Sequence, residues 1–335
     1  MTNVDRDLAT TETGSDLLVV KGLRASIFTR DGEVKAVDGV NFTVRRGESV
    51  GLVGESGSGK SMTCASLMRL LPVASAKILG GEVWFEGRDL LQLSESEMRD
   101  VRGRRMALVM QDSLTALNPV LTVGDQVAEP IRHHLKTDSA KTRDRVMEVL
   151  DSVRIPRPAE RLNKYPHQFS GGMRQRIAAA IGLGTEPALI IADEPTTALD
   201  VTIQAQFLTL LRDLKERSGL SLVWVTHDLG VVAQICDRVN VMYAGRIVES
   251  GVVRRILKSP QHPYTMALME SVPAIGVRRK RLYQIPGQPP DLANLPKGCP
   301  FFPRCPLRMA ICQSEYPTAT PTEDGGYVHC WARAA

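Results

Sequence analysis

The chain has 335 residues, of which 43% are hydrophobic and 24% charged, and its formal net charge is +5 at pH 7. This composition is typical of a soluble globular protein, and the small positive charge permits contact with anions or a membrane surface without requiring nucleic acid. No apolar run approaches the ~18–20 residues that would span a bilayer. Residues 1–16 are polar and lack the apolar core of a signal peptide, so we expect a disordered tail and a cytoplasmic location.

Hydrophobic patterning predicts the first elements of the chain. Residues 17–61 are expected to form short strands joined by turns, and the alternation in Val40–Val44 is typical of a half-buried strand. The apolar run at 104–110 predicts a buried strand. From about residue 112 to 170 the character changes, and apolar residues recur at helical spacing, which predicts a mainly helical insert. The residues that carry this spacing are Val146, Val149, Leu150 and Val153.

The following segments alternate between strands and helices. Residues 188–193 and 221–226 are compact apolar runs, as expected for strands that are covered on both faces. Residues 203–217, which lie between them, have the pattern of a helix. This alternation predicts an α/β fold with a largely parallel sheet. Residues 239–251 predict a hairpin that turns at Ala244 and Gly245.

Composition changes after Ser259, where prolines become dense. We therefore predict a domain boundary near residue 259, with one domain at 17–258 and an extension at 259–335.

Residues 54–61 read GESGSGKS and match the phosphate-loop pattern G-x-x-x-x-G-K-S/T. Glycines let the backbone wrap closely and point N–H groups inward, and the following helix directs its positive end at the phosphates. Lys60 is expected to reach the β- and γ-phosphates, and Ser61 to offer a hydroxyl to Mg²⁺. The preceding strand and following helix favour this interpretation over a chance Gly/Ser turn. The predicted ATP-binding residues here are Gly54, Glu55, Ser56, Gly57, Ser58, Gly59, Lys60 and Ser61.

Two adjacent carboxylates follow the apolar run at 188–193. Asp193 ends this predicted strand, in a position suited to hold Mg²⁺. Glu194 comes next, and we predict that it is the general base that polarises the attacking water. The alternative is a solvated strand end, which a buried strand in a chain with a phosphate loop makes the weaker interpretation.

The segment FSGGMRQR, residues 169–176, is a second glycine-rich turn at a predicted helix N-terminus and hence a second candidate anion site. It resembles the L-S-G-G-Q signature of ATP-binding cassette (ABC) ATPases, with Phe169 and Met173 in place of leucine and glutamine. In that family two cassettes pair head to tail, and each ATP lies between one phosphate loop and the opposite signature. The resemblance therefore implies that Ser170, Gly171 and Gly172 contact the ATP of a partner subunit.

Other motifs of the family follow in order over residues 17–258. Gln111 matches the Q-loop glutamine that contacts Mg²⁺ and takes part in catalysis, and Asp200 ends TALD, which resembles the D-loop. His227 matches the switch histidine that contacts the γ-phosphate. The resemblance implies a P-loop NTPase fold with a RecA-like core, an antiparallel β subdomain and a helical subdomain. For the residue that stacks on adenine, Val34 and Phe28 stay open.

The C-terminal extension restricts the resemblance to one subfamily of ABC ATPases. Residues 259–273, 285–292 and 298–317 are similar to the extension of dipeptide and oligopeptide importer ATPases. The resemblance implies an ATPase subunit that powers peptide import from the cytoplasmic face of the cell membrane. Its implied partners are a second ABC ATPase subunit, expected to be a homologue, two transmembrane permeases and an extracytoplasmic solute-binding protein, with no nucleic acid. Importers of nickel or glutathione carry the same tail, and a non-transport ABC ATPase is a more distant alternative.

Four cysteines lie in the extension, at Cys299, Cys305, Cys312 and Cys330. Their spacing lacks the tight C-x2–4-C pair that is usual for zinc, whereas iron–sulfur clusters take four thiolates at more varied spacing. Nearby basic residues, Arg304 among them, are expected to lower the thiolate pKa. Members of the resembled subfamily can carry a 4Fe-4S cluster at such cysteines, which we predict here in a structural role. Zinc and free or disulfide-forming thiols remain alternatives.

Overall fold

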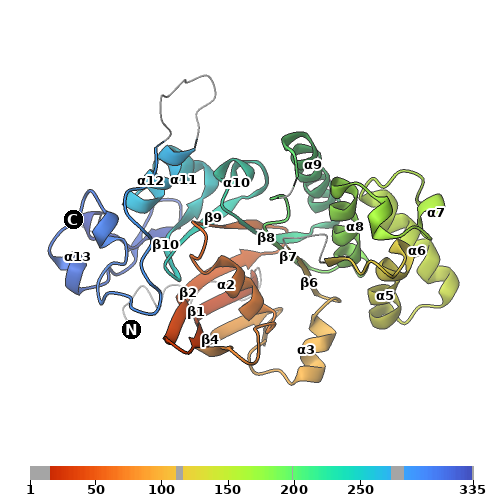
Figure 1. The fold of residues 1–335 in the computed structure, drawn as a ribbon, viewed down its shortest axis with the longest axis horizontal. Coiled ribbons are helices and arrows are strands. Elements are labelled where there is room, and N and C mark those ends of the chain that lie inside the picture. The colour runs from red at the N-terminus through yellow and green to blue at the C-terminus, as the bar shows by residue number, and fades with distance from the viewer. Residues whose placement is uncertain (1–15, 111–115, 198, 273–282, 334–335) are drawn as a thin grey trace. The chain divides into compact units, whose positions relative to one another are not determined.

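The computed structural model describes residues 16–110, 116–197, 199–272 and 283–333 (Figure 1). The expected disordered tail falls outside these ranges, apart from residue 16. The described residues form two compact units that each combine segments distant in sequence. The first unit takes its residues from 1–45, 50–91 and 226–335, and the second from 46–49 and 92–225. The predicted boundary near residue 259 stays a prediction.

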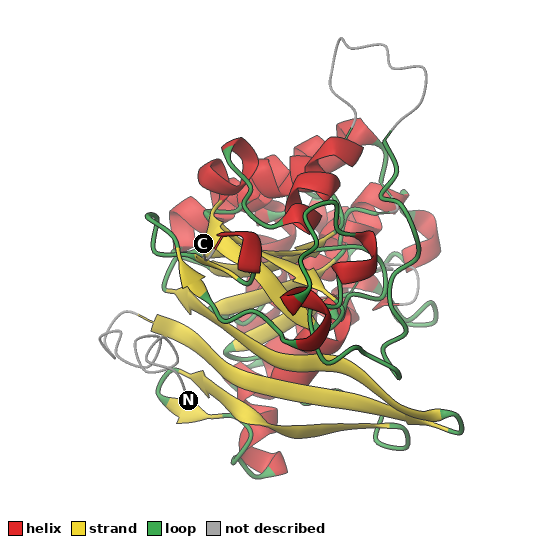
Figure 2. Ribbon diagram, turned by 90° about the vertical axis from the view of Figure 1, so that its left-hand side faces the viewer, coloured by secondary structure: helices red, strands yellow, loops and turns green. Residues whose placement is uncertain are grey.

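An antiparallel sheet of four strands belongs to the first unit, in the order β2-β1-β4-β5 (Figure 2). In β2, buried side chains alternate with more exposed ones, which confirms the half-buried strand predicted at Val40–Val44. β1 and β2 are each far longer than the short strands that the sequence predicts. The strands are β1 (Asp16–Thr29), β2 (Gly32–Arg45), β4 (Ala76–Phe85) and β5 (Arg88–Asp89).

The first unit also contains a run of strands in the order β11-β12-β10-β9-β3. β3 and β9 are parallel, and the other pairs are antiparallel. β9 and β10 form the predicted hairpin, and Ala244 and Gly245 at its turn have φ of 49° and 78°. The strands are β3 (Ser49–Val53), β9 (Arg238–Tyr243), β10 (Arg246–Val252), β11 (Thr320–Pro321) and β12 (Tyr327–Val328).

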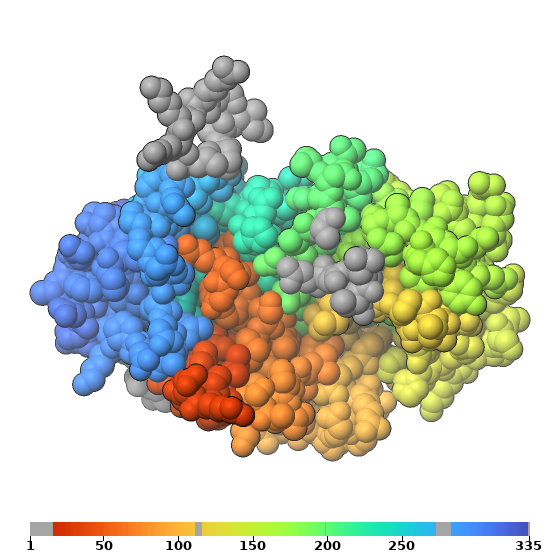
Figure 3. All heavy atoms as spheres, in the orientation of Figure 1, coloured from red at the N-terminus to blue at the C-terminus, as the bar shows by residue number. Residues whose placement is uncertain are grey.

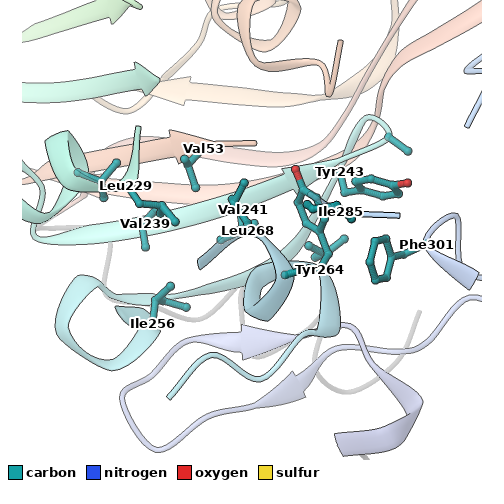
Figure 4. Packing of buried hydrophobic residues seen from close by; sticks show 14 of the residues in the cluster. Val53, Leu229, Val239, Val241, Tyr243, Ile256, Tyr264, Leu268, Ile285 and Phe301 are labelled. Carbon is teal, nitrogen blue, oxygen red and sulfur yellow. The ribbon is translucent and has the colours of Figure 1, made fainter. Parts of the chain in front are cut away.

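The hydrophobic core of the first unit joins these strands to helices and to the extension (Figure 4). Tyr243 from β9, Tyr264 from α12 and Phe301 from the extension pack together, with ring centroids 4.5–5.5 Å apart. Such aromatic contacts add stability beyond the area that they bury. The helical elements of this unit are α2 (Lys60–Leu67), α10 (Leu229–Ile235), α11 (Val253–Lys258), α12 (Pro263–Ser271), η2 (Phe302–Arg304), α13 (Ile311–Ser314) and η3 (Trp331–Arg333).

The extension also contacts the N-terminal strands of the first unit. The backbone N–H of Lys35 donates to the carbonyl of Leu292 at 3.1 Å, and the Tyr327 hydroxyl donates to the carbonyl of Asn41 at 2.8 Å. Figure 3 shows the blue residues of the extension against the orange-red residues of the strands. The extension is therefore packed into this unit rather than attached to it as a separate tail.

The second unit has parallel strands in the order β8-β7-β6 and a group of helices. These strands confirm the three apolar runs that the sequence singles out. Helices α5, α6 and α8 pack against one another. From residue 116 to residue 170 the helical elements are α5, α6, α7 and η1, and the bounds of the helical insert stay a prediction. The elements are β6 (Met106–Val109), β7 (Leu189–Asp193), β8 (Ser221–Thr226), α3 (Glu95–Val101), α5 (Val123–Leu135), α6 (Ser139–Ser152), α7 (Pro158–Arg161), η1 (Pro166–Gln168), α8 (Gly171–Leu183) and α9 (Val201–Ser218).

None of the helices in the described ranges is both long enough and apolar enough to cross a membrane.

A buried polar network ties β10 to α12 and the extension. The Glu249 carboxylate is fully buried, pairs with Arg255, and accepts from the backbone N–H groups of Gln261 and His262 at 2.9 Å each. Arg255 also contacts Asp324 of the extension at 3.2 Å. Burying a carboxylate is costly unless it is paired and hydrogen-bonded, and both conditions are met here.

His262 begins α12 as its N-cap, and its Nδ1 accepts from the backbone N–H of Tyr264 at 3.0 Å. Burial, with a smaller contribution from the charge of His329, lowers the pKa of His262 to about 3. The ring is therefore neutral in the folded protein at physiological pH, and protonation favours the unfolded chain.

We predict that the first unit loses stability as pH falls below about 6.5, because the unfolded chain then binds a proton at His262 that the folded chain does not accept until about pH 3. This group should cost about 1 kcal/mol between pH 7 and 5.5. The substitution His262→Asn keeps a capping oxygen. Its free energy of unfolding, measured in urea, should therefore fall by about 1 kcal/mol less than that of the wild type between pH 7 and 5.5. His167→Asn, at an exposed histidine of the second unit, should retain the wild-type slope. Equal slopes in all three proteins would contradict the prediction.

Candidate ATP site and C-terminal extension

The phosphate loop lies in the first unit between β3, which ends at Val53, and α2, which begins at Lys60. This strand–loop–helix order confirms the sequence prediction. At Gly54 a Cβ atom would collide with the carbonyl oxygen of Met242 in β9. Gly59 has φ of 104°, and a Cβ there would collide with the carbonyl oxygen of Ala36 in β2. Only glycine fits such close approaches of backbone to backbone.

Two side chains of this loop have the properties of an anion site. The Lys60 ammonium is buried and donates to the carbonyl oxygens of Gly54 and Glu55 at 2.9 and 3.0 Å. The Ser58 hydroxyl is buried and has no hydrogen-bond partner among the described residues. Ser61 is exposed in the first turn of α2, whose positive end faces the loop. A cation, an unsatisfied hydroxyl and a helix N-terminus suit a phosphate chain.

His227 also belongs to the first unit. It follows the last residue of β8 and precedes Asp228, whose carboxylate caps α10 by accepting from the N–H of Gly230 at 2.7 Å. The His227 side chain is exposed. The sequence thus places an exposed imidazole at the carboxyl end of a buried strand, where ligands of α/β sheets bind.

The two predicted carboxylates lie in the second unit, at the carboxyl end of β7. Asp193 is the last residue of the strand. Glu194 has φ of 44°, and its N–H donates to the carbonyl of Val225 at 3.0 Å. The Thr197 hydroxyl donates to a carboxylate oxygen of Glu194 at 3.1 Å. Glu194 therefore has a constrained backbone and an oriented side chain, as a general base requires.

The signature segment forms the start of α8. Ser170 caps the helix by accepting from the N–H of Met173 at 3.4 Å. A Cβ at Gly172 would collide with Ile203 of α9, so this glycine allows the two helices to approach closely. Phe169, which replaces the usual leucine, is buried. Asp200 caps α9 through the N–H groups of Thr202 and Ile203, at 3.1 and 3.0 Å.

The predicted site residues therefore form two groups. Gly54–Ser61 and His227 share the first unit, and Asp193, Glu194, the signature and Asp200 share the second. Gln111 lies outside the described residues. Of the two candidates for adenine stacking, Phe28 is 43% exposed and lies 5.9 Å from the Lys77 ammonium. Val34 pairs with Ile27 in the same hairpin, and the choice between the two stays open.

The structure adds two residues that the sequence did not assign to this site. Arg304 of the extension donates to both carboxylate oxygens of Glu55, at 2.8 and 3.1 Å. The Tyr264 hydroxyl accepts from the backbone N–H of Glu55 at 2.8 Å. These contacts cross the predicted boundary near residue 259. No local sequence pattern signals them, because 249 and 209 residues separate the partners.

The cysteines of the extension differ from the sequence predictions in two ways. Burial raises the pKa of Cys299 to about 11 and raises the pKa of Cys305 and Cys330. The expectation that basic neighbours lower these pKa values is therefore wrong, because loss of hydration outweighs the effect of nearby positive charges.

The predicted metal centre is also not seen as a formed set of ligands among the described residues. None of the six cysteines, all of which lie in the described ranges, forms a disulfide. In the described part of the chain, no group of three or more His, Cys, Asp or Glu side chains is arranged to hold a metal ion. The four thiols of the extension do lie near one another, since the other three each contribute to the raised pKa of Cys299.

Comparison with known proteins agrees with this geometry. Residues 37–197 match the ABC transporter family, and residues 248–312 match the family described as oligopeptide/dipeptide transporter, C-terminal region. The dipeptide transport ATP-binding protein DppD of Bacillus subtilis is 50% identical, over 94% of each chain. The oligopeptide transport ATP-binding protein OppD of Salmonella typhimurium is 48% identical over 90% of this chain and 89% of its own.

The chain belongs to the ATP-binding proteins of dipeptide and oligopeptide ABC transporters. It is an ABC ATPase, and its fold agrees with solved members of that class. A bacterial ABC transporter cassette solved as a dimer is 29% identical, with a TM-score of 0.64 over 71% of this chain and 99% of the cassette. A post-hydrolysis state of such a cassette bound to ADP and phosphate gives a TM-score of 0.63.

Proposed function

We propose that this protein hydrolyses ATP to power the import of dipeptides or oligopeptides through a membrane permease complex. The observation that carries the proposal is that one chain joins a phosphate loop with the geometry of an anion site to the extension of peptide transporters. Other small solutes, such as nickel or glutathione, are the alternative cargo. The ATPase does not touch the solute, so its own residues do not select between them.

The residues have the following proposed roles in hydrolysis. The N–H groups of Gly54–Gly59, with Lys60, bind the phosphate chain and offset its charge. Ser61, Asp193 and Gln111 supply the hard oxygen ligands that Mg²⁺ prefers, and the ion when bound neutralises charge on the phosphates. Glu194 takes the proton of the attacking water, and His227 donates to the γ-phosphate. Ser170–Gly172 and Asp200 complete the ATP site of a second ABC ATPase subunit.

We propose a place for this subunit at the cytoplasmic face of the cell membrane, on two permeases that work with an extracytoplasmic solute-binding protein. The second unit offers a surface for a permease segment. A pocket of about 290 Å³ lies between α5 and α6, lined by polar and charged residues that include Asp125, Arg132 and Arg143. Val146 and Leu162 form part of its wall and supply an apolar contact.

We also propose that the four cysteines of the extension take up a structural metal centre, a 4Fe-4S cluster or alternatively Zn²⁺. The support for this proposal is the collection of four soft thiol ligands in one short segment and their mutual proximity. A bound metal would cross-link cysteines that are separated along the sequence of this loop-rich segment.

Glu194→Gln should leave ATP binding close to wild type and lower the rate of hydrolysis by at least about a hundredfold, because the amide cannot accept the proton of water. Steady-state ATPase assays and equilibrium nucleotide binding measure the two effects. Glu186→Gln is a matched control, since Glu186 also has a positive φ, of 54°, but precedes β7. Near-normal turnover by Glu194→Gln would remove the general-base role.

Reversing the charge of the pocket between α5 and α6 should uncouple transport from hydrolysis. We expect Arg132→Glu combined with Arg143→Glu to lower permease co-purification and peptide uptake by about tenfold or more, while the basal ATPase activity of the isolated subunit is retained. Arg217→Glu is the control, because Arg217 is an exposed residue of α9 that does not line the pocket. A complex with this variant should take up peptide normally. Full uptake by the double variant would exclude this docking surface. In the same assay, uptake of nickel or glutathione but not of peptide by the wild-type complex would identify the alternative cargo.

Metal analysis tests the cysteine proposal. Protein purified without oxygen should contain iron and sulfide, or zinc, and Cys305→Ser should lose that metal while Cys64→Ala, outside the extension, keeps it. Colourless wild-type protein without iron or zinc would refute the metal centre. ATPase activity is not the readout, so this test is independent of the ATP site.

A further inference from the structure

Glu55 is the second residue of the phosphate loop. Its backbone N–H, its carbonyl oxygen and its carboxylate each form hydrogen bonds with other side chains. Its backbone N–H donates to the Tyr264 hydroxyl at 2.8 Å, and its carbonyl oxygen accepts from the Lys60 ammonium at 3.0 Å. Its carboxylate accepts two hydrogen bonds from Arg304, at 2.8 and 3.1 Å. Lys60 is the residue proposed to bind phosphate, so a single loop residue links it to the extension.

Arg304 is itself held rigidly. Its side chain is 3% exposed, and besides Glu55 it donates to the carbonyl oxygens of Pro286 and Ile285 at 3.0 and 3.4 Å and to the Tyr243 hydroxyl at 3.3 Å. The guanidinium carbon lies 5.8 Å from the centre of the Tyr243 ring and 5.9 Å from that of Phe301. Figure 4 shows Tyr243, Tyr264, Ile285 and Phe301 gathered in this part of the core.

The charge of Glu55 gives this pair a role beyond packing. A carboxylate in a loop that binds a polyanion repels its ligand, and the Glu55 side chain is only 27% exposed, so water screens the repulsion incompletely. Arg304 forms a bidentate, charge-assisted pair that cancels this charge and holds the carboxylate toward the extension.

A second contact joins the extension to the same loop. Pro289, Pro290 and Leu292 line a small pocket together with Glu55–Ser58. The carbonyl of Leu292 accepts from Lys35 in β2, the strand that approaches the loop at Gly59. The extension thus contacts the phosphate loop at two places, through Arg304 and through residues 289–292.

We propose that Arg304 is a positioning residue for nucleotide binding, which acts through Glu55 to neutralise and orient the phosphate loop. The inference rests on the proposed ATPase function and makes the extension a working part of the ATP site. A purely structural role for Arg304 would not depend on the charge of Glu55. The positioning role predicts that the affinity for ATP does depend on that charge.

Arg304→Gln should raise both the KM for ATP and the Kd for ATP by about tenfold, with a much smaller change in kcat, because the unpaired Glu55 carboxylate then opposes the phosphates. The measurements use the full chain within its transporter complex, and the melting temperature is recorded alongside. Arg308→Gln removes an exposed arginine of the same segment and should leave the KM unchanged. An unchanged KM in Arg304→Gln would overturn the proposal.

The double variant Arg304→Gln with Glu55→Gln separates the two roles of Arg304. Removing both charges should return the KM to within about threefold of wild type, although the melting temperature stays lowered by the lost hydrogen bonds. A double variant with as high a KM as Arg304→Gln would show that Arg304 is only a structural support.

If Arg304→Gln does not fold, Glu55→Gln alone carries the test. The glutamine oxygen can still accept from Arg304, so the loop keeps its position and gains one net positive charge, and the KM for ATP should fall by about twofold or more. A raised KM would overturn the proposal. Absence of ATPase activity in the wild-type complex would instead contradict the proposed function.

Discussion

The close approach of backbone to backbone around the phosphate loop is the constraint on which the first unit depends. Gly54 lies against the carbonyl of Met242 in β9, and Gly59 lies against the carbonyl of Ala36 in β2. The loop therefore takes its shape from two strands that belong to different sheets. Because no side chain fits between these backbones, the loop cannot relax independently of β2 and β9, and whatever stabilises those strands also stabilises the phosphate site.

The extension is one of the elements that stabilise β9. Phe301 and Ile285 pack in the same core as Tyr243 at the end of that strand, and Tyr264 joins them from α12. β12 extends the sheet beyond β10, the partner of β9. The extension therefore shares both a hydrophobic core and a sheet with β9, the strand that contacts the phosphate loop. Its contacts with Glu55 follow from this packing.

The parts of this structure that are encoded locally could be predicted from the sequence. The glycine spacing of residues 54–59, the apolar run that ends at Asp193 and the turn at Ala244 each depend on neighbours in the chain, and each forms as predicted. The Arg304–Glu55 pair joins residues 249 positions apart, so no periodicity or spacing reports it. The thiol pKa values were predicted in the wrong direction because a sequence shows nearby charges, whereas burial exists only after folding.

The same burial explains how the cysteine segment is packed relative to the candidate ATP site. Cys299 and Cys305 flank Phe301 and Arg304, and both pack against the core that contains Tyr243. The N–H of Cys299 donates to the carbonyl of Cys312 at 2.8 Å, which closes this segment on itself. η2 is only three residues long and ends directly before Cys305, and the N–H of Phe302 at its start donates to the carbonyl of Cys299 at 3.0 Å. The backbone that carries Arg304 is therefore connected to both cysteines. The C-terminal extension, which matches that of peptide transporters, is thus also packed against the loop that we propose binds ATP.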